Sequence, residues 1–367
     1  MLKFLDKKIL AVCLLFSANA FAEINIAVIA PMDGHYKVYG NEIIQGAETA
    51  VNEINANGGL NGRKVNLIKI EDPCNDYLSL TTAQMLALTK DEDYRVHMVL
   101  GHFCQNAAGK IAETYAKAKI IQIAPVPVSG ESVKTSYDGF IRFSGHTEQQ
   151  ARDFFKFFEK TMPDSKFAVI YDDKNTEDIG IVNALQKEFA RVEKQDRIVA
   201  FNYSTDLGEI VNNVIASEAR AVFIMGSPQN ITDIAKVLKR GNDNLFVFVN
   251  KYHAKKQIAK SVGDEIYFIS LPSLKDNPNF AENLVRMRLL GVEPEGLMVY
   301  SYLATRLWQG MVEKAGSFDY DKVAKAVNGG TAIATGWGNV TYTKGRPNKS
   351  INYRIYRQKN GDYAQVH

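Results

Sequence analysis

Up to residue 56, apolar residues recur at the spacing of one helical face, with polar residues between them. After that the pattern changes. Glycines at Gly58-Gly59 favour the left-handed conformation that ends a helix, and Asn61-Gly62 favours a tight turn. The next apolar run, from Val65 to Ile70, has the residue types of a β-strand. One face of the helix must pack on a sheet, because its apolar members recur at helical spacing: Ile43, Ala47, Ala50, Val51 and Ile54.

The same rhythm of short apolar runs and helical patterns continues along the chain in two sets. The first set of predicted strands is Ile24–Ala30, Val65–Ile70, Val96–Leu100 and Ile120–Ala124. The second set is Phe167–Tyr171, Ile198–Asn202, Ala221–Met225 and Leu245–Val249, separated by helices near 148–160, 177–191 and 230–239. This order predicts two α/β lobes with parallel sheets and right-handed crossovers.

The junction between the two sets and the region after them give further detail. Residues 142–147 contain no Pro-, Gly- or Ser-rich tether, so the lobes should touch. After Ile266 the pattern predicts an extended segment to Leu271. Helices are then expected at 280–290, 296–315 and 319–327. These three helices come in addition to those that the second lobe needs.

The run from Gly46 to Val65 resembles periplasmic solute-binding proteins of the Leu/Ile/Val-binding type. The order of helix, double-glycine stop and Asn61-Gly62-Arg63-Lys64 strand entry carries the resemblance, although any αβ unit could show part of it. A second match is Thr335-Gly336-x4-Thr341-Tyr342-x2-Gly345, where that family has a late Gly-rich hairpin. The resemblance covers Glu23 to about Asp362. It implies a type I periplasmic binding fold of the Venus-flytrap kind, with two doubly wound lobes joined by a three-stranded hinge.

The resemblance also sets the expected domain boundaries. In that family the chain crosses between the lobes three times. Here the crossings are expected near 143–146, 269–273 and 346–350. Lobe 1 is then 23–143 plus 272–346, and lobe 2 is 146–268 plus 350–367.

Residues 1–22 have the features of a secretory signal peptide. Lys3, Lys7 and Lys8 precede the apolar run Ile9–Phe16, and Ala20-Phe21-Ala22 fits cleavage after Ala22. An uncleaved anchor is the alternative, but this run has eight residues where a membrane span needs about 20. A lipoprotein is disfavoured because the branched Val12 precedes Cys13, where a lipoprotein signal has a small residue. We expect a mature, soluble protein in the periplasm.

The charge of the chain argues against nucleic-acid binding, and its cysteine count favours a disulfide. The formal charge of +3 falls to +1 without the leader, and no Lys/Arg-rich run exists to bind nucleic acid. Of the three cysteines, Cys74 and Cys104 remain, and an exported chain with an even count most simply pairs them. A redox or metal role is the alternative, but the spacing matches no zinc site. The bridge would stabilise the chain by about 3 to 4 kcal/mol and fix the turn at Phe103.

In open parallel sheets the ligand lies beyond the carboxyl ends of the strands, where helix N-termini present free N–H groups. The two lobes should therefore form a cleft between six loops: residues 31–39, 101–105 and 125–129 of lobe 1, and residues 172–176, 226–229 and 250–253 of lobe 2.

Two loops of lobe 1 resemble the family's binding loops but differ at key positions. The run from Gly101 to Gln105 resembles Gly-His-x-Cys-Ser, in which the Ser hydroxyl and main-chain N–H groups hold the α-carboxylate of the ligand. Gln105 replaces that Ser. The Val126 loop aligns with one that offers a carbonyl to the ligand ammonium and a Thr hydroxyl to its carboxylate. Val128 has no hydroxyl, and Pro127 removes a backbone donor.

Lobe 2 departs further from the family pattern. Lys251 falls at or beside the position where the family has an acidic residue that pairs with the ligand ammonium, and a shift of one residue would put Asn250 there. If Lys251 faces the cleft, it favours an anionic ligand group. Otherwise it belongs to a solvated run with Lys255 and Lys256. Ser227 stands where an aromatic residue is expected, and Thr176 ends the first loop of this lobe.

The apolar part of the ligand has its own candidates. Tyr39 matches a family aromatic that lines the side-chain end of the pocket, and Phe103 lies in the neighbouring loop. Both could instead pack under the first helix. Leu297 and Tyr300 are candidates for the rim of lobe 1.

Enzyme motifs are missing from the sequence. There is no Gly-x-Ser-x-Gly elbow, no phosphate-binding loop, no His-Glu-x2-His and no dinucleotide fingerprint. A catalytic role for His102 would need a carboxylate partner that the sequence does not identify. We predict no catalytic residue, no metal and no cofactor.

Together these features predict a monomeric substrate-binding component of an ABC importer. It would close on a small amino acid or related polar solute and deliver it to permease subunits in the inner membrane. Three alternatives remain: a ligand that is an organic anion or amide, a ligand sensor for a membrane receptor, and an enzyme on the same scaffold.

Overall fold

The computed structural model describes residues 23–91, 93–130, 132–133, 137–203, 206–242, 244–250, 255–275, 277–328, 330, 332–342, 352–360 and 362–366. The signal peptide predicted for residues 1–22 lies outside these residues. Within them, no helix is both long and apolar enough to span a membrane.

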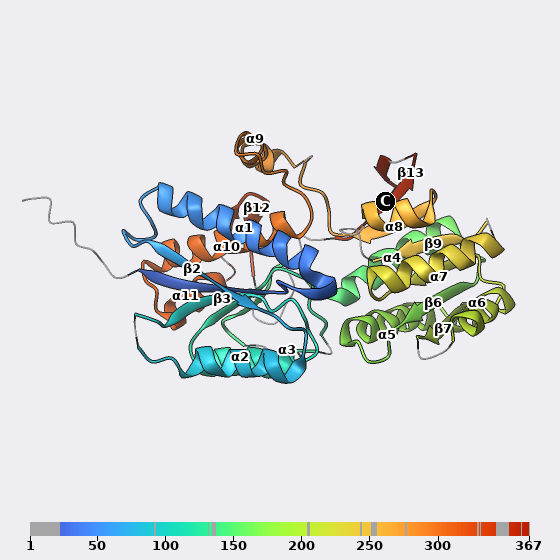
Figure 1. The fold of residues 1–367 in the computed structure, drawn as a ribbon, viewed down its shortest axis with the longest axis horizontal. Coiled ribbons are helices and arrows are strands. Elements are labelled where there is room, and N and C mark those ends of the chain that lie inside the picture. Colours follow the sequence, from blue (N-terminus) through green and yellow to red (C-terminus); the bar gives the residue numbers. More distant parts are fainter. Residues whose placement is uncertain are drawn as a thin grey trace, which may run out of the picture.

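The N-terminal half of the chain builds a five-stranded sheet in the order β2-β1-β3-β4-β5 (Figure 1). Every neighbouring pair in it is parallel. The order reverses between β1 and β3, so the loops after these two strands diverge and leave a crevice at the carboxyl edge. The strands are β1 (Ile24–Ala30), β2 (Val65–Glu71), β3 (Val96–Leu100), β4 (Ile121–Ala124) and β5 (Phe140–Arg142).

Helices cover both faces of this sheet (Figure 1). Alternate residues of β1 show the division, because Ile26 and Val28 belong to one apolar cluster while Ala27 and Ile29 belong to another. The α1 and α10 helices lie on the first face, and α2 and α3 lie on the second. The helices associated with this sheet are α1 (Lys37–Ala56), α2 (Asp76–Leu88), α3 (Ala108–Lys117), α10 (Leu297–Ala315) and α11 (Tyr320–Asn328).

The helix predicted from the sequence before Gly58 is α1, and its apolar face is buried as expected. It packs against α10 at a very short distance. A β-carbon added at Gly46 would lie 2.1 Å from the Met298 carbonyl oxygen. Close by, the Ser301 hydroxyl donates to the Ile43 carbonyl at 2.5 Å. The first helix of the sheet is thus locked to a helix that follows more than 240 residues later.

The second sheet has seven strands in the order β14-β13-β10-β9-β8-β6-β7. Five strands, β6, β7, β8, β9 and β10, pair in parallel, whereas β13 and β14 are antiparallel additions at one edge. The sequence patterns did not predict this C-terminal hairpin. The strands are β6 (Phe167–Tyr171), β7 (Ile198–Asn202), β8 (Ala221–Ile224), β9 (Phe246–Val249), β10 (Ile266–Ser270), β13 (Arg354–Lys359) and β14 (Asp362–Gln365).

Helices flank the second sheet as well (Figure 1). The α4 helix packs on α5, and α7 packs on both α6 and α8. Phe154 of α4 stands at the centre of an aromatic core with ring contacts to Phe167, Phe223 and Phe248 at 4.9 to 5.4 Å. The helices are α4 (Thr147–Thr161), α5 (Thr176–Arg191), α6 (Leu207–Ala216), α7 (Pro228–Gly241) and α8 (Lys255–Val262).

The chain passes between the two sheets more than once. It leaves the first sheet after β5 and enters α4, and it returns after β10 to α9 (Ala281–Leu289) and α10. The third passage lies between β12 (Gly338–Val340) and β13, where residues 343–351 are outside the described part of the chain. The two α/β lobes are therefore as predicted, while the domain boundaries stay a prediction. The late hairpin is β11 (Ile333–Thr335) with β12, and short 3₁₀ turns occur at Gly34–Tyr36, Gln195–Arg197 and Pro278–Phe280.

Candidate functional site

A cavity of about 410 Å³ lies between the two sheets and is lined by residues of both lobes. It sits at the carboxyl ends of the parallel strands, because its walls include the loops after β1, β3, β4, β6, β9 and β10. The lining residues are Tyr36, Tyr39, Cys74, Asp76, Phe103, Cys104, Gln105, Asn106, Val126, Pro127, Gln150, Asp172, Lys174, Asn175, Glu177, Asn250, Ile269, Ser270, Leu271, Pro272, Ser273, Leu274, Lys275, Pro294, Glu295, Gly296, Leu297, Val299, Tyr300 and Tyr353.

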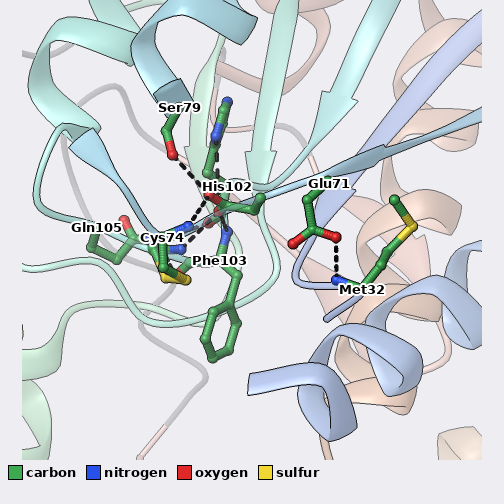
Figure 2. Close-up of a disulfide and its surroundings, with 9 residues drawn as sticks. Met32, Glu71, Cys74, Ser79, His102, Phe103 and Gln105 are labelled. Carbon is green, nitrogen blue, oxygen red and sulfur yellow. Dashed lines mark hydrogen bonds and ion pairs between the residues drawn. A yellow bond between two sulfur atoms is a disulfide. The ribbon is translucent and has the colours of Figure 1, made fainter. Parts of the chain in front are cut away.

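The disulfide predicted from the cysteine count is present and forms part of the cavity wall. Cys74 and Cys104 are joined, with their Cα atoms 5.1 Å apart. Figure 2 shows the bridge beside Phe103 and Gln105. It ties the loop after β2 to the loop after β3. The position of Phe103 at the cavity is therefore fixed covalently through the neighbouring residue.

Asp72, a buried carboxylate, holds the same two loops together by hydrogen bonds. Its Oδ2 atom accepts from the main-chain N–H groups of Phe103 and Cys104, both at 3.0 Å. Its Oδ1 atom accepts from the Ser79 hydroxyl at 2.8 Å and from the Cys74 N–H at 3.3 Å. Two N–H groups of the loop that resembles a carboxylate-binding loop are thus already bonded to a carboxylate of the protein itself.

His102 is also buried beside Asp72 and does not line the cavity. Its Nε2 atom lies 2.9 Å from the Tyr115 hydroxyl, and its Nδ1 atom lies 3.9 Å from Asp72 Oδ2. Burial lowers the pKa of His102 to about 4, against the opposing effect of the Asp72 charge. The imidazole is therefore neutral at pH 7. A carboxylate partner does exist, but the pair lies behind the wall of the cavity.

Aromatic rings form one side of the cavity. The Tyr39 and Phe103 rings stack with centroids 5.7 Å apart, and the Tyr36 ring lies 5.6 Å from Phe103. Burial, helped by the Glu42 charge, raises the pKa of the Tyr39 phenol, so this wall is uncharged. Such a surface suits an apolar or aromatic part of a ligand.

Comparison with known proteins places the chain in a family. Residues 23–362 match the model of a family described as periplasmic binding protein. This chain belongs to that family.

Several members of the family resemble the chain over nearly its whole length. It is 25% identical to a Pseudomonas aeruginosa protein named amino acid binding protein, covering 95% of this chain and 94% of the relative. It is 24% identical to Leu/Ile/Val-binding protein homolog 1 of Brucella suis, covering 96% and 95%.

Solved structures share the fold. A leucine binding protein from Thermotoga maritima superposes with a TM-score of 0.80 at 18% identity, covering 94% of this chain and 98% of that one. A solute binding protein from R. palustris in complex with benzoate gives a TM-score of 0.76 at 15% identity, covering 94% and 95%. The matched family is a class of binding proteins, not of enzymes.

Six residues predicted for the site or its rim from the sequence line the cavity. They are Tyr39, Phe103, Gln105, Val126 and the two rim residues, Leu297 and Tyr300. Gln105 turns back toward its own loop, because its Nε2 donates to the carbonyls of His102 and Phe103 at 2.8 and 3.1 Å. Tyr300 likewise donates to the Pro272 carbonyl at 2.7 Å. The contact of these six residues with a ligand stays a prediction.

Val128 is not part of the cavity wall, contrary to the sequence-based assignment. Its side chain is fully buried in a small apolar cluster with Ala108, Ala124 and Val133. Its main-chain N–H donates to the Gly145 carbonyl at 3.1 Å. The side chain turned inward because a valine gains more from the core than from a polar cleft. This position therefore offers neither a hydroxyl nor a free N–H to a ligand carboxylate.

Two predicted residues of lobe 2 also lie outside the cavity lining. Ser227 accepts a hydrogen bond from the Asn230 N–H at 3.2 Å and so caps the start of α7. Thr176 bonds across the lobes, because its N–H and hydroxyl are 3.2 and 3.0 Å from Asn106 Oδ1. Lys251 lies outside the described residues, so its predicted place in the cleft stays a prediction.

Three polar lining residues were missed or only touched on by sequence reasoning. Asn250 was considered only as the alternative to Lys251, while Gln150 on α4 and Tyr353 before β13 had no motif to mark them. Asn250 directly follows β9, and its loop, 250–253, is one that the strand-end rule placed at the cleft. Tyr353 reaches the cavity only because the C-terminal hairpin adds to the second sheet.

The cavity wall offers no convincing metal site among the described residues. Asp72, Cys74 and Cys104 place their ligand atoms within 4.8 Å of one another, but the two sulfurs are bonded to each other. A disulfide provides no thiolate to bind a cation. This group therefore holds the loops rather than an ion.

Proposed function

We propose that this chain is the periplasmic substrate-binding component of an ABC importer, which closes its two lobes around a small polar organic solute. The observation that carries the proposal is the cavity, because a single space at the strand ends is lined by residues of both sheets. A ligand that contacts both walls stabilises the closed arrangement by its differential affinity.

Membership of the family supports the proposed partners and compartment. Its members are periplasmic binding proteins, so the chain is expected to be exported, with its leader cleaved near Ala22. The proposed partners are permease subunits in the inner membrane, which would recognise the closed lobes. We propose that the binding protein itself acts as a monomer.

The default ligand is an amino acid, including the branched-chain type, because relatives carry the names amino acid binding protein and Leu/Ile/Val-binding protein. The cavity wall favours a second ligand class, namely small organic solutes that are not amino acids. Val128 has no group to offer a carboxylate, and Asp72 already holds two N–H groups of the neighbouring loop. Among solved structures of the same fold, the R. palustris solute binding protein is in complex with benzoate, which is not an amino acid.

Thermal unfolding of the mature protein with a panel of amino acids, carboxylates and amides tests the binding function. A ligand at 100 times its dissociation constant raises stability by about 2.7 kcal/mol, so one compound should stand out. Small-angle scattering should then show a smaller radius of gyration with that compound. Absence of any stabilising small molecule, or chemical turnover of one that binds, would contradict the proposal.

A further inference from the structure

Three uncharged polar side chains from separate segments meet at the cavity. Gln150 comes from α4, Asn250 follows β9, and Tyr353 precedes β13. All three line the cavity, and all three are buried, with exposed fractions of 3%, 8% and 3%. They belong to the lobe-2 side of the site.

Several polar atoms of this group have no hydrogen-bond partner among the described residues. These are Gln150 Oε1 and both amide atoms of Asn250, while the Tyr353 hydroxyl has only the Gln150 amide close by. By contrast, the Tyr300 hydroxyl in the same cavity is bonded to the Pro272 carbonyl. Buried polar groups in folded proteins are normally paired, and an unpaired cluster in a cavity indicates partners supplied by a ligand.

The group is neutral as well as polar. Burial, helped by the Glu177 charge, raises the pKa of the Tyr353 phenol well above its usual value, while the Gln150 amide opposes this shift. The hydroxyl is therefore protonated at pH 7. The three side chains together offer donors and acceptors without a net charge.

Charges elsewhere on the described wall disfavour an anion. Four carboxylates line the cavity, Asp76, Asp172, Glu177 and Glu295, against two ammonium groups, Lys174 and Lys275. Lys275 is already engaged, since its Nζ atom lies 2.8 Å from Glu293 and 3.5 Å from Glu295. On the lobe-1 side, the N–H groups of Phe103 and Cys104 are held by Asp72. The described wall thus has little to offer a free carboxylate.

We propose that Gln150, Asn250 and Tyr353 form a subsite for an uncharged carboxamide-type group of the ligand, whose apolar part lies against Tyr36, Tyr39 and Phe103. A primary amide presents two N–H donors and a carbonyl acceptor, which match the free acceptors and donors of the three side chains. The inference rests on the proposed binding function and selects neutral amides over amino acids and organic anions within it.

Isothermal titration of the mature protein with matched amide and acid pairs tests this subsite. Benzamide is compared with benzoate, and isovaleramide with isovalerate, with leucine as the amino-acid probe. Each pair keeps one skeleton and changes only the polar group. We expect at least one amide to bind 10-fold or more tightly than its acid and than leucine.

Two variants assign the effect to the subsite. Asn250→Leu should weaken the amide at least 10-fold, and Tyr353→Phe, which removes a single hydroxyl, should weaken it several-fold. Tyr267→Phe is the matched control, because Tyr267 is a buried tyrosine of β10 outside the cavity lining. It should leave binding unchanged. If Asn250→Leu fails to fold, Tyr353→Phe still decides the question.

The outcomes separate the subsite from the general function. Tight binding of leucine or of an acid, unaffected by both variants, would overturn the carboxamide subsite and leave the binding protein intact. Failure of every amide to bind would overturn the subsite as well. If, in addition, no amino acid or carboxylate binds, the proposed function itself fails.

Discussion

At the residue scale, the buried carboxylate of Asp72 and the buried imidazole of His102 support one cavity wall from behind. Asp72 accepts four hydrogen bonds and lies beside the neutral His102. Burial lowers the pKa of His102, so its protonation is linked to folding. Stability therefore depends on pH through a side chain that does not line the cavity.

The His102 imidazole makes stability fall as the solution becomes acidic. The unfolded chain binds a proton near pH 6.5, whereas folded His102 resists until about pH 4. The contribution is therefore present above pH 6.5 and is lost as pH falls toward 4. We expect the free energy of unfolding to drop by about 2 to 3 kcal/mol over this window from this residue. Denaturant unfolding at half-unit pH steps measures it.

A His102→Gln variant isolates the effect, since glutamine does not titrate and can still bond Tyr115. Its unfolding free energy should change much less between pH 6.5 and 4. The contribution of Glu148 is lost mostly below this window. Burial alone would raise its pKa, but hydrogen bonds from His146 and Ser129 outweigh this and lower the pKa to about 2. Its contribution is lost only between about pH 4.5 and 2. Equal slopes for variant and parent would refute the assignment.

At the element scale, α1 shows how a helix that is readable from sequence depends on a distant partner. The spacing of its apolar residues and the glycine stop predicted the helix, and both are found. The sequence also contained Gly46 within the helix, but gave no reason for it. The reason is α10, whose Met298 carbonyl lies where a side chain would begin.

Gly46→Ala should therefore destabilise the protein, although alanine is the better helix former. We expect a loss of about 1 to 3 kcal/mol, because the two helices must move apart. The midpoint of urea unfolding, followed by circular dichroism, measures the change.

Asn52→Ala on the exposed face of the same helix is the matched control and should shift stability by less than about 0.5 kcal/mol. A Gly46→Ala protein as stable as the parent would show that α1 and α10 do not approach this closely.

At the scale of the whole molecule, hydrogen bonds at the N-terminus of α5 join the lobes beside the cavity. Asn106 Oδ1 in lobe 1 accepts from the N–H and hydroxyl of Thr176 in lobe 2. The Ser132 hydroxyl of lobe 1 donates to the same Thr176 oxygen at 3.0 Å. These bonds exist only when the lobes are together, so they favour the closed arrangement.

Thr176→Val should weaken ligand binding without touching the cavity wall. The variant loses the hydroxyl bonds across the lobes, each worth about 0.5 to 1.5 kcal/mol. We expect the dissociation constant of the ligand found by thermal shift to rise about 3- to 10-fold. Titration calorimetry measures it. Small-angle scattering at partial saturation should show a more open average shape.

Thr114→Val on α3 is the matched control, because its hydroxyl bonds only the Lys110 carbonyl of the same helix. It should bind ligand as the parent does. An unchanged affinity for Thr176→Val would show that these inter-lobe bonds play no part in closure.

Much of the fold followed from local pattern. Strands such as Ile24–Ala30, Val96–Leu100 and Phe167–Tyr171 were predicted at their observed limits, because buried parallel strands are short apolar runs. The C-terminal β13–β14 hairpin was not predicted. Its strands carry Arg, Lys and Gln at an edge of the sheet, so their sequence lacks an apolar run.

The candidate site was less predictable than the fold. Tyr39 and Phe103 were found by resemblance, yet Val128 turned into the core, and Ser227 became a helix cap. The sequence of a loop shows which residues lie near a strand end, but it does not show in which direction each side chain points. That choice depends on what the rest of the protein packs against the loop.

Local patterns were enough to predict the two α/β lobes, the pairing of Cys74 with Cys104 and the family, because periodicity, cysteine count and motif can be read along the chain. Folding was needed to bring Gln150, Asn250 and Tyr353 to one cavity and to place Asp72 at the N–H groups of Phe103 and Cys104. The first three residues are 100 residues or more apart along the chain. Asp72 and its two N–H partners lie in different loops. Their meeting depends on packing and lobe placement, which no local pattern encodes.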